Sequence, residues 1–255
     1  MATRRRAPGG KRARTPIWAE PAPGTRRPRL TRDQIAMAAL SIADSEGIEA
    51  LSMRRVADEL DVGTMTLYYY VRTKQDLLAL MDDALMAEAV VPPDELPTDW
   101  RRAITAIARA SRDAFLHHPW ALHMRSLGIG PNSMRHMEQS MAAVASLPLD
   151  DHGKMDLLAI IDDFVFGHAL RMSDPIMSSI VDPRAARAIT SFTASQVATG
   201  AFPLLEALLG DDEPLEAFYR IARWMADEGR FDRGLEAILD GFEARIGRRP
   251  RKATP

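Results

Sequence analysis

Apolar residues recur at helical spacing within Leu51–Lys74 and predict two short helices. Val56 and Leu60 lie on one face of the first helix. Residues 61–63, which end in a glycine, interrupt this period, and Leu67 and Val71 resume it at i and i+4. Two short helices joined by a tight turn form a helix-turn-helix. The pattern therefore predicts this motif in the N-terminal third of the chain.

The polar face of the second short helix is unusual, because it carries hydroxyls, a thioether and aromatic rings. If Leu67 points inward, the 3.6-residue period turns these side chains outward. Hydroxyls can bond phosphates and base edges, and methyl groups can touch thymine methyls in the major groove. Alternatively, the tyrosines merely cap a small core. The predicted DNA contacts here are Thr64, Met65, Thr66, Tyr68, Tyr69 and Tyr70.

Helix signals flank this motif on its N-terminal side. Thr31 begins a T-x-x-Q capping box and Gly47 supplies a stop, which predicts a first helix between them. Ser52 caps the next helix, whose first turn holds Arg54 and Arg55. Cations there oppose the helix dipole, so we expect Arg54 to meet a phosphate or base, while Arg55 is as readily an ordinary surface charge.

A longer helix follows the motif. Thr73 and Asp76 form another capping box, Lys74 lies in the first turn, and the apolar pattern runs to about Val90 before a proline pair ends it. We expect this helix to join the DNA-reading part to the rest of the chain.

Amphipathic patterns then predict helices at residues 100–117 and around residues 134–144, with a short apolar piece at residues 120–127 between them. A methionine-rich wall usually belongs to a core, but it also suits an adaptable ligand pocket. The residues predicted to line such a pocket are Trp120, His123, Met124, Met137, Met141, Phe164 and His168.

Two later helices, at residues 154–172 and 231–246, carry more apolar residues than one buried face requires. A second copy of the chain is the simplest partner that could bury the additional apolar residues. Gly234 and Gly241 would permit the helices of the two copies to approach closely. The residues predicted for this dimer interface are Leu158, Ile161, Val165, Leu235, Leu239 and Phe242. Residues 183–197 and 215–226 also have helical patterns, whereas the glycines and acids at residues 200–213 predict connections.

Composition places the chain among all-helical proteins. It has 255 residues, 46% of them hydrophobic, and strand patterns are nearly absent. No apolar stretch approaches the ~18 residues of a membrane span, and no secretion signal is present, so we expect a cytoplasmic protein without a membrane partner. Cysteine is absent, which excludes disulfides, thiol catalysis and thiolate metal sites.

Charge is divided unevenly along the chain. Residues 1–29 hold nine cations against one acid, so the net charge of −2 leaves −10 on the remainder. This segment has no apolar period and is expected to be disordered in isolation. It is either a basic arm that lies along DNA or a solubilising tail. Ile17 and Trp18 are exceptions within it and suggest a point that docks on the folded protein.

Catalysis has little support in the sequence. Six histidines lie near acids, but His168 is separated from Asp162 and Asp163 by five or six residues, which places them on different helix faces. No H-E-x-x-H spacing, phosphate loop or G-x-S-x-G elbow occurs. We therefore predict no catalytic residues, no metal and no cofactor.

Residues 64–78, TMTLYYYVRTKQDLL, resemble the recognition-helix signature of the tetracycline-repressor (TetR) family. The similarity covers about fifty residues, and residues 231–246, FDRGLEAILDGFEARI, resemble the end of the regulatory domain in the tetracycline-repressor subgroup. The resemblance implies a phosphate contact at Lys74 and a four-helix dimer interface. His123 lies near a drug-binding histidine of that subgroup, but the central match is loose, so neither tetracycline nor magnesium is carried over.

These observations predict an all-α protein with a basic arm (1–29), a three-helix DNA-binding domain (30–76), a regulatory and dimerisation domain (77–247) and a basic tail (248–255). The predicted function is a homodimeric repressor that binds a palindromic operator in double-stranded DNA and is released by a small, largely apolar effector. In the alternative, the C-terminal domain is a protein-interaction module without an effector.

Overall fold

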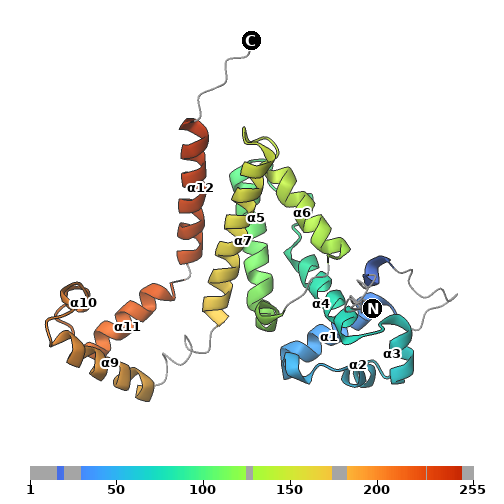
Figure 1. Ribbon diagram of the computed structural model, residues 1–255, viewed down its shortest axis with the longest axis horizontal. Helices are drawn as coiled ribbons and strands as arrows, with labels where there is room; N and C mark the ends of the chain where they lie inside the picture. The colour runs from blue at the N-terminus through green and yellow to red at the C-terminus, as the bar shows by residue number, and fades with distance from the viewer. Residues whose placement is uncertain (1–15, 20–29, 125–128, 174–182, 228, 249–255) are drawn as a thin grey trace, which may run out of the picture. The chain divides into compact units, whose positions relative to one another are not determined.

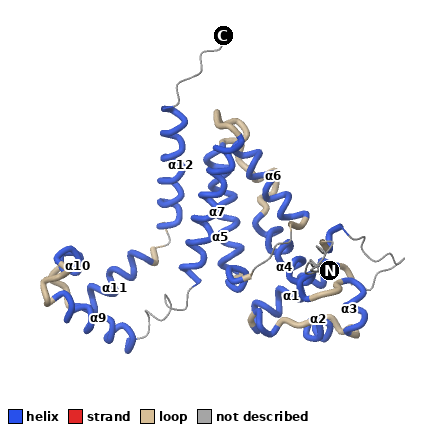
Figure 2. The backbone as a smooth tube through the Cα atoms, viewed as in Figure 1, coloured by secondary structure: helices blue, strands red, loops and turns tan. Residues whose placement is uncertain are grey.

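The computed structural model describes residues 16–19, 30–124, 129–173, 183–227 and 229–248. Within these ranges helices are the only regular elements (Figures 1 and 2), which confirms the all-α prediction. The chain divides into two compact units, called here the head (Met1–Ala87 with Arg125–Met134) and the body (Glu88–Met124 with Arg135–Pro255). Most of the predicted arm and nearly all of the tail lie outside the described residues.

The first helix of the head begins and ends at the capping residues that the sequence predicted. The Thr31 hydroxyl accepts from the Gln34 N–H at 3.1 Å, and the Gln34 side chain accepts from the Thr31 N–H at 2.9 Å, which confirms the capping box. Gly47, with φ of 85°, ends the first helix. The elements that lie in or enter the head are η1 (Ile17–Ala19), α1 (Arg32–Glu46), η2 (Ile48–Ala50), α2 (Met53–Glu59), α3 (Thr64–Tyr70) and α4 (Lys74–Ala89).

The head has its own small core. One apolar face of α1 meets the inward residues of α2, α3 and α4, all of them almost fully buried. This core holds α3 by its inner face and leaves its outer face uncovered. The core residues are Ile35, Ala39, Ile42, Val56, Ala57, Leu67, Val71, Leu77 and Met81.

The body holds the predicted C-terminal helices and one that the sequence did not indicate. Residues 203–209 form a helix where connections were expected, because Pro203 fits a first helical turn and Leu204 to Leu209 continue it. The remaining elements are α5 (Trp100–His117), η3 (Pro119–His123), α6 (Pro131–Val144, which begins in the head), α7 (Asp151–Ser173), α9 (Pro183–Val197), α10 (Pro203–Leu209), α11 (Pro214–Met225) and α12 (Arg230–Arg248).

Helices α5, α7 and α12 pack together around one apolar cluster (Figure 1). Phe164 of α7 stacks on Phe231 of α12 with ring centroids 5.3 Å apart. A Cβ at Gly234 would lie 2.7 Å from the Phe164 ring, so this close approach requires glycine. Arg101 of α5 adds ion pairs to Asp240 and Glu243 of α12 at 2.5 and 2.6 Å. None of the described helices is long and apolar enough to cross a lipid bilayer.

Candidate nucleic-acid interface

Helix α3 presents a large uncovered surface for its length. Met65, Tyr69 and Tyr68 are 80%, 60% and 42% exposed, whereas Leu67 is completely buried. The i to i+3 spacing of the helix explains this division, because Leu67 and Tyr70 share the inner face. Thr64 and Thr66 are half-buried at the edge of the outer face. Five of the six predicted contacts in this helix therefore remain accessible to a ligand.

Tyr70 is the exception among the predicted contacts, because it is buried. Only 7% of the residue is exposed, because it lies three positions after Leu67 and turns into the head core. Its ring meets the Tyr69 ring edge-to-face at a centroid distance of 5.6 Å. Tyr70 therefore packs against Tyr69 from the side of the head core.

The turn before α3 has the tight geometry that a helix-turn-helix requires. Asp61 adopts a left-handed conformation with φ of 50°, which aspartate tolerates better than most residues. The Val62 N–H then bonds the Ala57 carbonyl at 3.0 Å, and the Gly63 carbonyl accepts from Thr66 at 2.8 Å. These local bonds fix where α3 begins relative to α2.

Arg54 and Arg55 have different roles. Arg55 bonds Glu46 at 2.6 Å and Glu59 at 2.9 Å, and these hydrogen bonds raise the pKa of its guanidinium. It is therefore a structural link between α1 and α2. The Arg54 side chain is 86% exposed, and it makes a long, 3.8 Å ion pair with Asp58. The sequence favoured Arg54 as the available cation, and its exposure agrees with that choice.

Lys74 is the first residue of α4 and follows the end of α3 by four residues in the sequence. The Thr73 hydroxyl accepts from the Asp76 N–H at 3.2 Å, which is the predicted cap, and the Lys74 side chain is exposed. A cation at this position can reach a phosphate without breaking a bond that holds the helix.

A buried carboxylate joins α4 to the start of α6 within the head. Asp83 is only 4% exposed and accepts from the Asn132 N–H at 2.8 Å, the Ser133 N–H at 3.3 Å and the Asn132 side-chain amide at 2.9 Å. The two backbone donors are otherwise unsatisfied N–H groups of a helix start. The sequence analysis missed Asp83, since its partners lie about fifty residues away.

The body contains a cavity of 520 Å³ between α7 and α12. Phe164 and His168 contribute rings, and the lining includes three arginines and Asp163. One of the arginines, Arg233, is already paired with Asp227. Burial lowers the pKa of His168, and the nearby positive charges, Arg230 first among them, lower it further. The cavity therefore combines aromatic surface with an excess of positive charge. It is lined by Asp163, Phe164, Gly167, His168, Arg171, Arg230, Arg233 and Gly234.

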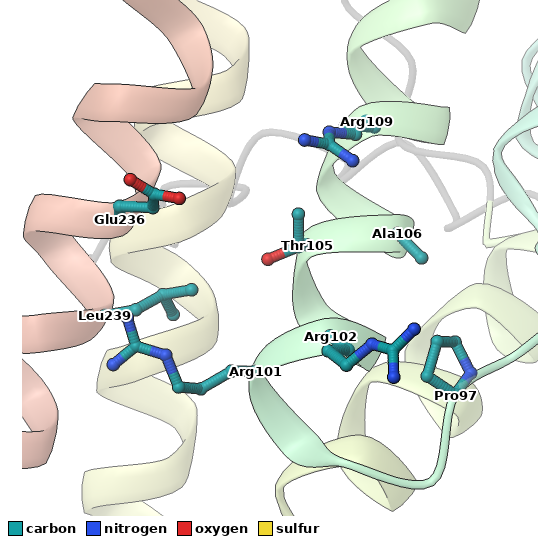
Figure 3. Close-up of a pocket in the computed structure, with 8 residues that line it drawn as sticks. All are labelled: Pro97, Arg101, Arg102, Thr105, Ala106, Arg109, Glu236 and Leu239. Atoms are coloured by element: carbon teal, nitrogen blue, oxygen red, sulfur yellow. The ribbon is translucent and has the colours of Figure 1, made fainter.

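A second cavity, of 390 Å³, lies on the other side of α12, against α5 (Figure 3). Of its three arginines, Arg101 and Arg109 are held by acids of α12, the latter by Asp232 at 2.9 Å. Figure 3 shows the third, Arg102, pointing toward Pro97 instead. Because the other two guanidiniums are already neutralised, this cavity offers less to an anion than the first one.

Comparison with known proteins identifies the chain. A family model described as "Tetracyclin repressor-like, C-terminal domain" matches residues 92–246, and another, "Bacterial regulatory proteins, tetR family", matches residues 35–81. The chain is 34% identical over 232 residues to the HTH-type transcriptional repressor DrrR1 of Streptomyces coeruleorubidus, which covers 90% of this chain and 83% of that protein. The chain belongs to the TetR family.

Solved structures agree with this assignment. ActR of Streptomyces coelicolor in its apo form is 30% identical, with a TM-score of 0.64 over 88% of this chain and 99% of that chain. ActR in complex with actinorhodin is 32% identical, with a TM-score of 0.64 over 86% and 99%. As a TetR-family protein, the chain is a transcriptional regulator and not an enzyme.

The predicted ligand residues of this TetR-family protein do not all meet at one cavity. Phe164 and His168 line the α7–α12 cavity, but the other five line neither of the two cavities described above. Met141 packs on the body core, and Trp120 is buried with its ring 5.7 Å from that of His118. His123 and Met137 are exposed, and Met124 is half-buried.

The residues predicted for the dimer interface lie in the core of the single chain. All six are at most 8% exposed in a single chain, because they form the cluster that holds α5, α7 and α12 together. They belong to the core of a single chain, which periodicity alone does not distinguish from a surface that a partner covers. The six residues are Leu158, Ile161, Val165, Leu235, Leu239 and Phe242.

Proposed function

We propose that this chain is a homodimeric repressor that binds a palindromic operator through α3 of each copy and releases it when a small molecule binds the body. The exposed Met65, Tyr68 and Tyr69 beside a fully buried Leu67 are the observation that carries this proposal. A helix with that outer face suits the major groove. The proposed DNA-binding domain spans residues 30–76 and the regulatory domain residues 77–247, in a protein that acts on DNA in the cytoplasm.

Lys74→Ala is expected to weaken binding to all DNA sequences alike. A lysine on a phosphate supplies charge without reading a base, so its loss lowers the slope of log affinity against log salt by about 1 per contact. Fluorescence anisotropy on a selected operator and on an unrelated duplex, over a salt series, measures both effects. A loss confined to the selected operator would instead make Lys74 a base-reading residue.

Dimerisation is proposed through the uncovered stripe of α7 and α12, in place of the buried residues first predicted. Ile160, Phe164 and Gly167 follow at i, i+4 and i+7 on α7, and Ile160 is 42% exposed. On α12, Gly241 is likewise uncovered, since a Cβ at Gly241 or Gly167 would meet nothing within 4 Å. Uncovered glycines on both helices let another pair of helices approach closely.

Gly241→Trp is expected to weaken the dimer by roughly two orders of magnitude or more, because a two-fold interface would meet the new ring twice. The single chain has open space at Gly241, so the variant should keep its helix content. Sedimentation velocity over a concentration series measures the change. Gly247→Trp is the matched control, since Gly247 is also open but lies about 120° away around the helix. If both variants dimerise like the parent, the interface lies elsewhere.

The effector is proposed to bind in the body, as the complex of ActR with actinorhodin suggests for a similar protein. The α7–α12 cavity of 520 Å³ lies within the range of small-molecule sites. Its guanidiniums favour an effector with an acidic group, and its aromatic rings favour an effector that also has an apolar part. Since Phe164 and Gly167 belong to both the cavity and the proposed interface, a second copy would cover the cavity.

The alternative, a body that binds another protein, is favoured by one observation. Leu204, Phe192 and Trp224 on helices α9 to α11 are 86%, 66% and 55% exposed, which is unusual for large apolar residues. Replacing all three with serine tests this function. If the triple variant no longer binds a protein partner but still responds to a small molecule, the alternative is supported. If it still binds the partner but no longer responds to a small molecule, the small-molecule sensor is supported.

The proposal as a whole is tested by selecting bound sites from random DNA and then screening small molecules for release of that DNA. We expect a palindromic site and at least one releasing compound. A ligand releases DNA only to the extent that it prefers the released conformation. If the protein selects a DNA site but no compound releases it from that site, the DNA-binding function would stand and the proposed response to a small molecule would be refuted.

A further inference from the structure

Two arginines of the α7–α12 cavity have no acidic partner within the residues that the structure describes. Arg171, in the last turn of α7, is exposed, and Arg230, the first residue of α12, donates to the Met225 carbonyl at 3.3 Å. Arg233 differs, because Asp227 already holds its guanidinium. Arg171 and Arg230 are therefore the cations of this cavity that a bound anion can reach without breaking an ion pair.

The charge of the cavity lining suits a single negative charge on a ligand. Three arginines against Asp163 leave two positive charges, and the pairing of Arg233 with Asp227 reduces these to one. His168 adds none at neutral pH, because burial and the nearby arginines lower its pKa. Arg230 also lies at the positive end of the α12 dipole, where a cation is unfavourable unless an anion is near. A monoanion therefore neutralises the cavity, whereas a dianion leaves it negative.

An aromatic wall lies in the same cavity. Phe164 stacks on Phe231 at a centroid distance of 5.3 Å, and His168 meets Phe231 edge-to-face at 5.0 Å. Because Phe231 is completely buried, it holds both rings from the side of the body core. Gly167 adds open space beside them, since a Cβ there would meet nothing within 4 Å. A planar aromatic ligand can stack on this wall.

We propose that the α7–α12 cavity binds a planar aromatic monocarboxylate. Arg171 and Arg230 bond its carboxylate, because a guanidinium fork matches the two carboxylate oxygens. Phe164 and His168 stack on its ring. Asp163 accepts a hydrogen bond from a hydroxyl group of the ligand and repels a second carboxylate. This inference rests on the proposed function only where it makes such a compound the effector, because binding to the cavity needs no DNA.

Direct binding of four compounds to the full-length protein tests the ligand class, with isothermal titration calorimetry in the absence of DNA. Naphthoate has the ring and the charge, naphthalenemethanol only the ring, and cyclohexanecarboxylate only the charge. Naphthoate should bind about 10-fold more tightly than naphthalenemethanol, because hydrogen bonds to a charged group contribute more. It should bind several-fold more tightly than cyclohexanecarboxylate, which cannot stack. A naphthalenedicarboxylate should bind more weakly than naphthoate, because Asp163 repels its second charge.

Three full-length variants test which cations bind the carboxylate. Arg171→Gln and Arg230→Gln should each weaken naphthoate binding by about 10-fold and leave naphthalenemethanol binding unchanged, because each removes a charged partner of the carboxylate only. Arg187→Gln is the matched control, since Arg187 on α9 is an exposed cation of the body outside the cavity, and it should bind naphthoate like the parent. Circular dichroism first establishes equal helix content.

The proposal is overturned if naphthoate does not bind, if it binds no better than naphthalenemethanol or cyclohexanecarboxylate, or if the Arg171 and Arg230 variants bind it like the Arg187→Gln control. If naphthoate binds as expected but does not release the selected operator, the ligand class stands and the effector role of this cavity, part of the proposed function, is refuted. If another compound releases the operator without needing Arg171 or Arg230, the sensor stands and the ligand class is refuted. The two failures are therefore distinguishable.

Discussion

Gly130→Ala is expected to lower the free energy of unfolding by about 3 kcal/mol, the upper end of overpacking effects. A Cβ at residue 130 would lie 2.1 Å from Asp83 Oδ1 and 2.7 Å from Asp83 Cβ, so neither side can give way cheaply. Asp83 would have to leave the N–H groups of Asn132 and Ser133, and a buried carboxylate would lose its donors.

Thermal unfolding followed by circular dichroism measures this effect, with an expected fall in Tm of roughly 6–12 °C. Gly247→Ala is the matched control, since a Cβ there meets nothing within 4 Å, and it should stay within about 1 kcal/mol of the parent. Equal melting of Gly130→Ala and the control would mean that the joint between Asp83 and the start of α6 does not form as described.

The double variant Tyr68→Ala, Tyr69→Ala is expected to bind the selected operator about 100-fold more weakly, or worse. A lost base contact costs about 1–3 kcal/mol, and a symmetric dimer loses it in both half-sites. The two residues are 42% and 60% exposed and contribute little to the head core, so the variant should remain folded. Anisotropy titration against the selected operator and an unrelated duplex measures affinity and preference together.

Met37→Ala provides the control for this double variant, because Met37 on α1 is an exposed apolar side chain of the same head, at 59%. It should leave DNA affinity unchanged. If the double variant loses the same amount of affinity for every DNA sequence, the two tyrosines contribute to binding without reading bases. If it binds like the parent, α3 is not the recognition helix.

Most of the head could be predicted from sequence because its signals are local. The Thr31–Gln34 box, the stop at Gly47 and the turn before α3 each depend on residues at most four or five positions apart. The exposure of Tyr68 and Tyr69 follows from the same helical period. The burial of Tyr70 was not predicted, because the aromatic run was treated as one surface, although the period assigns its third member to the core.

Contacts between segments far apart in the sequence were not predictable from local patterns. Asp83 and Asn132 are about fifty residues apart, so no periodicity joins them. The apolar stripes of α7 and α12 were recognised, but whether Leu235 or Gly241 faces the chain's own core depends on where α5 lies. The arginines of the α7–α12 cavity come from the ends of two helices, where a charge usually indicates only a solvated surface.

The most direct test of the central claim is selection of duplexes from a random pool by the purified protein at low salt, repeated with the Tyr68→Ala, Tyr69→Ala variant. The parent should select a palindrome whose half-sites are spaced by about 10–10.5 base pairs or a multiple, and the variant should fail to enrich it. A parent protein that binds no duplex, or a variant that enriches the same palindrome equally well, would contradict this account.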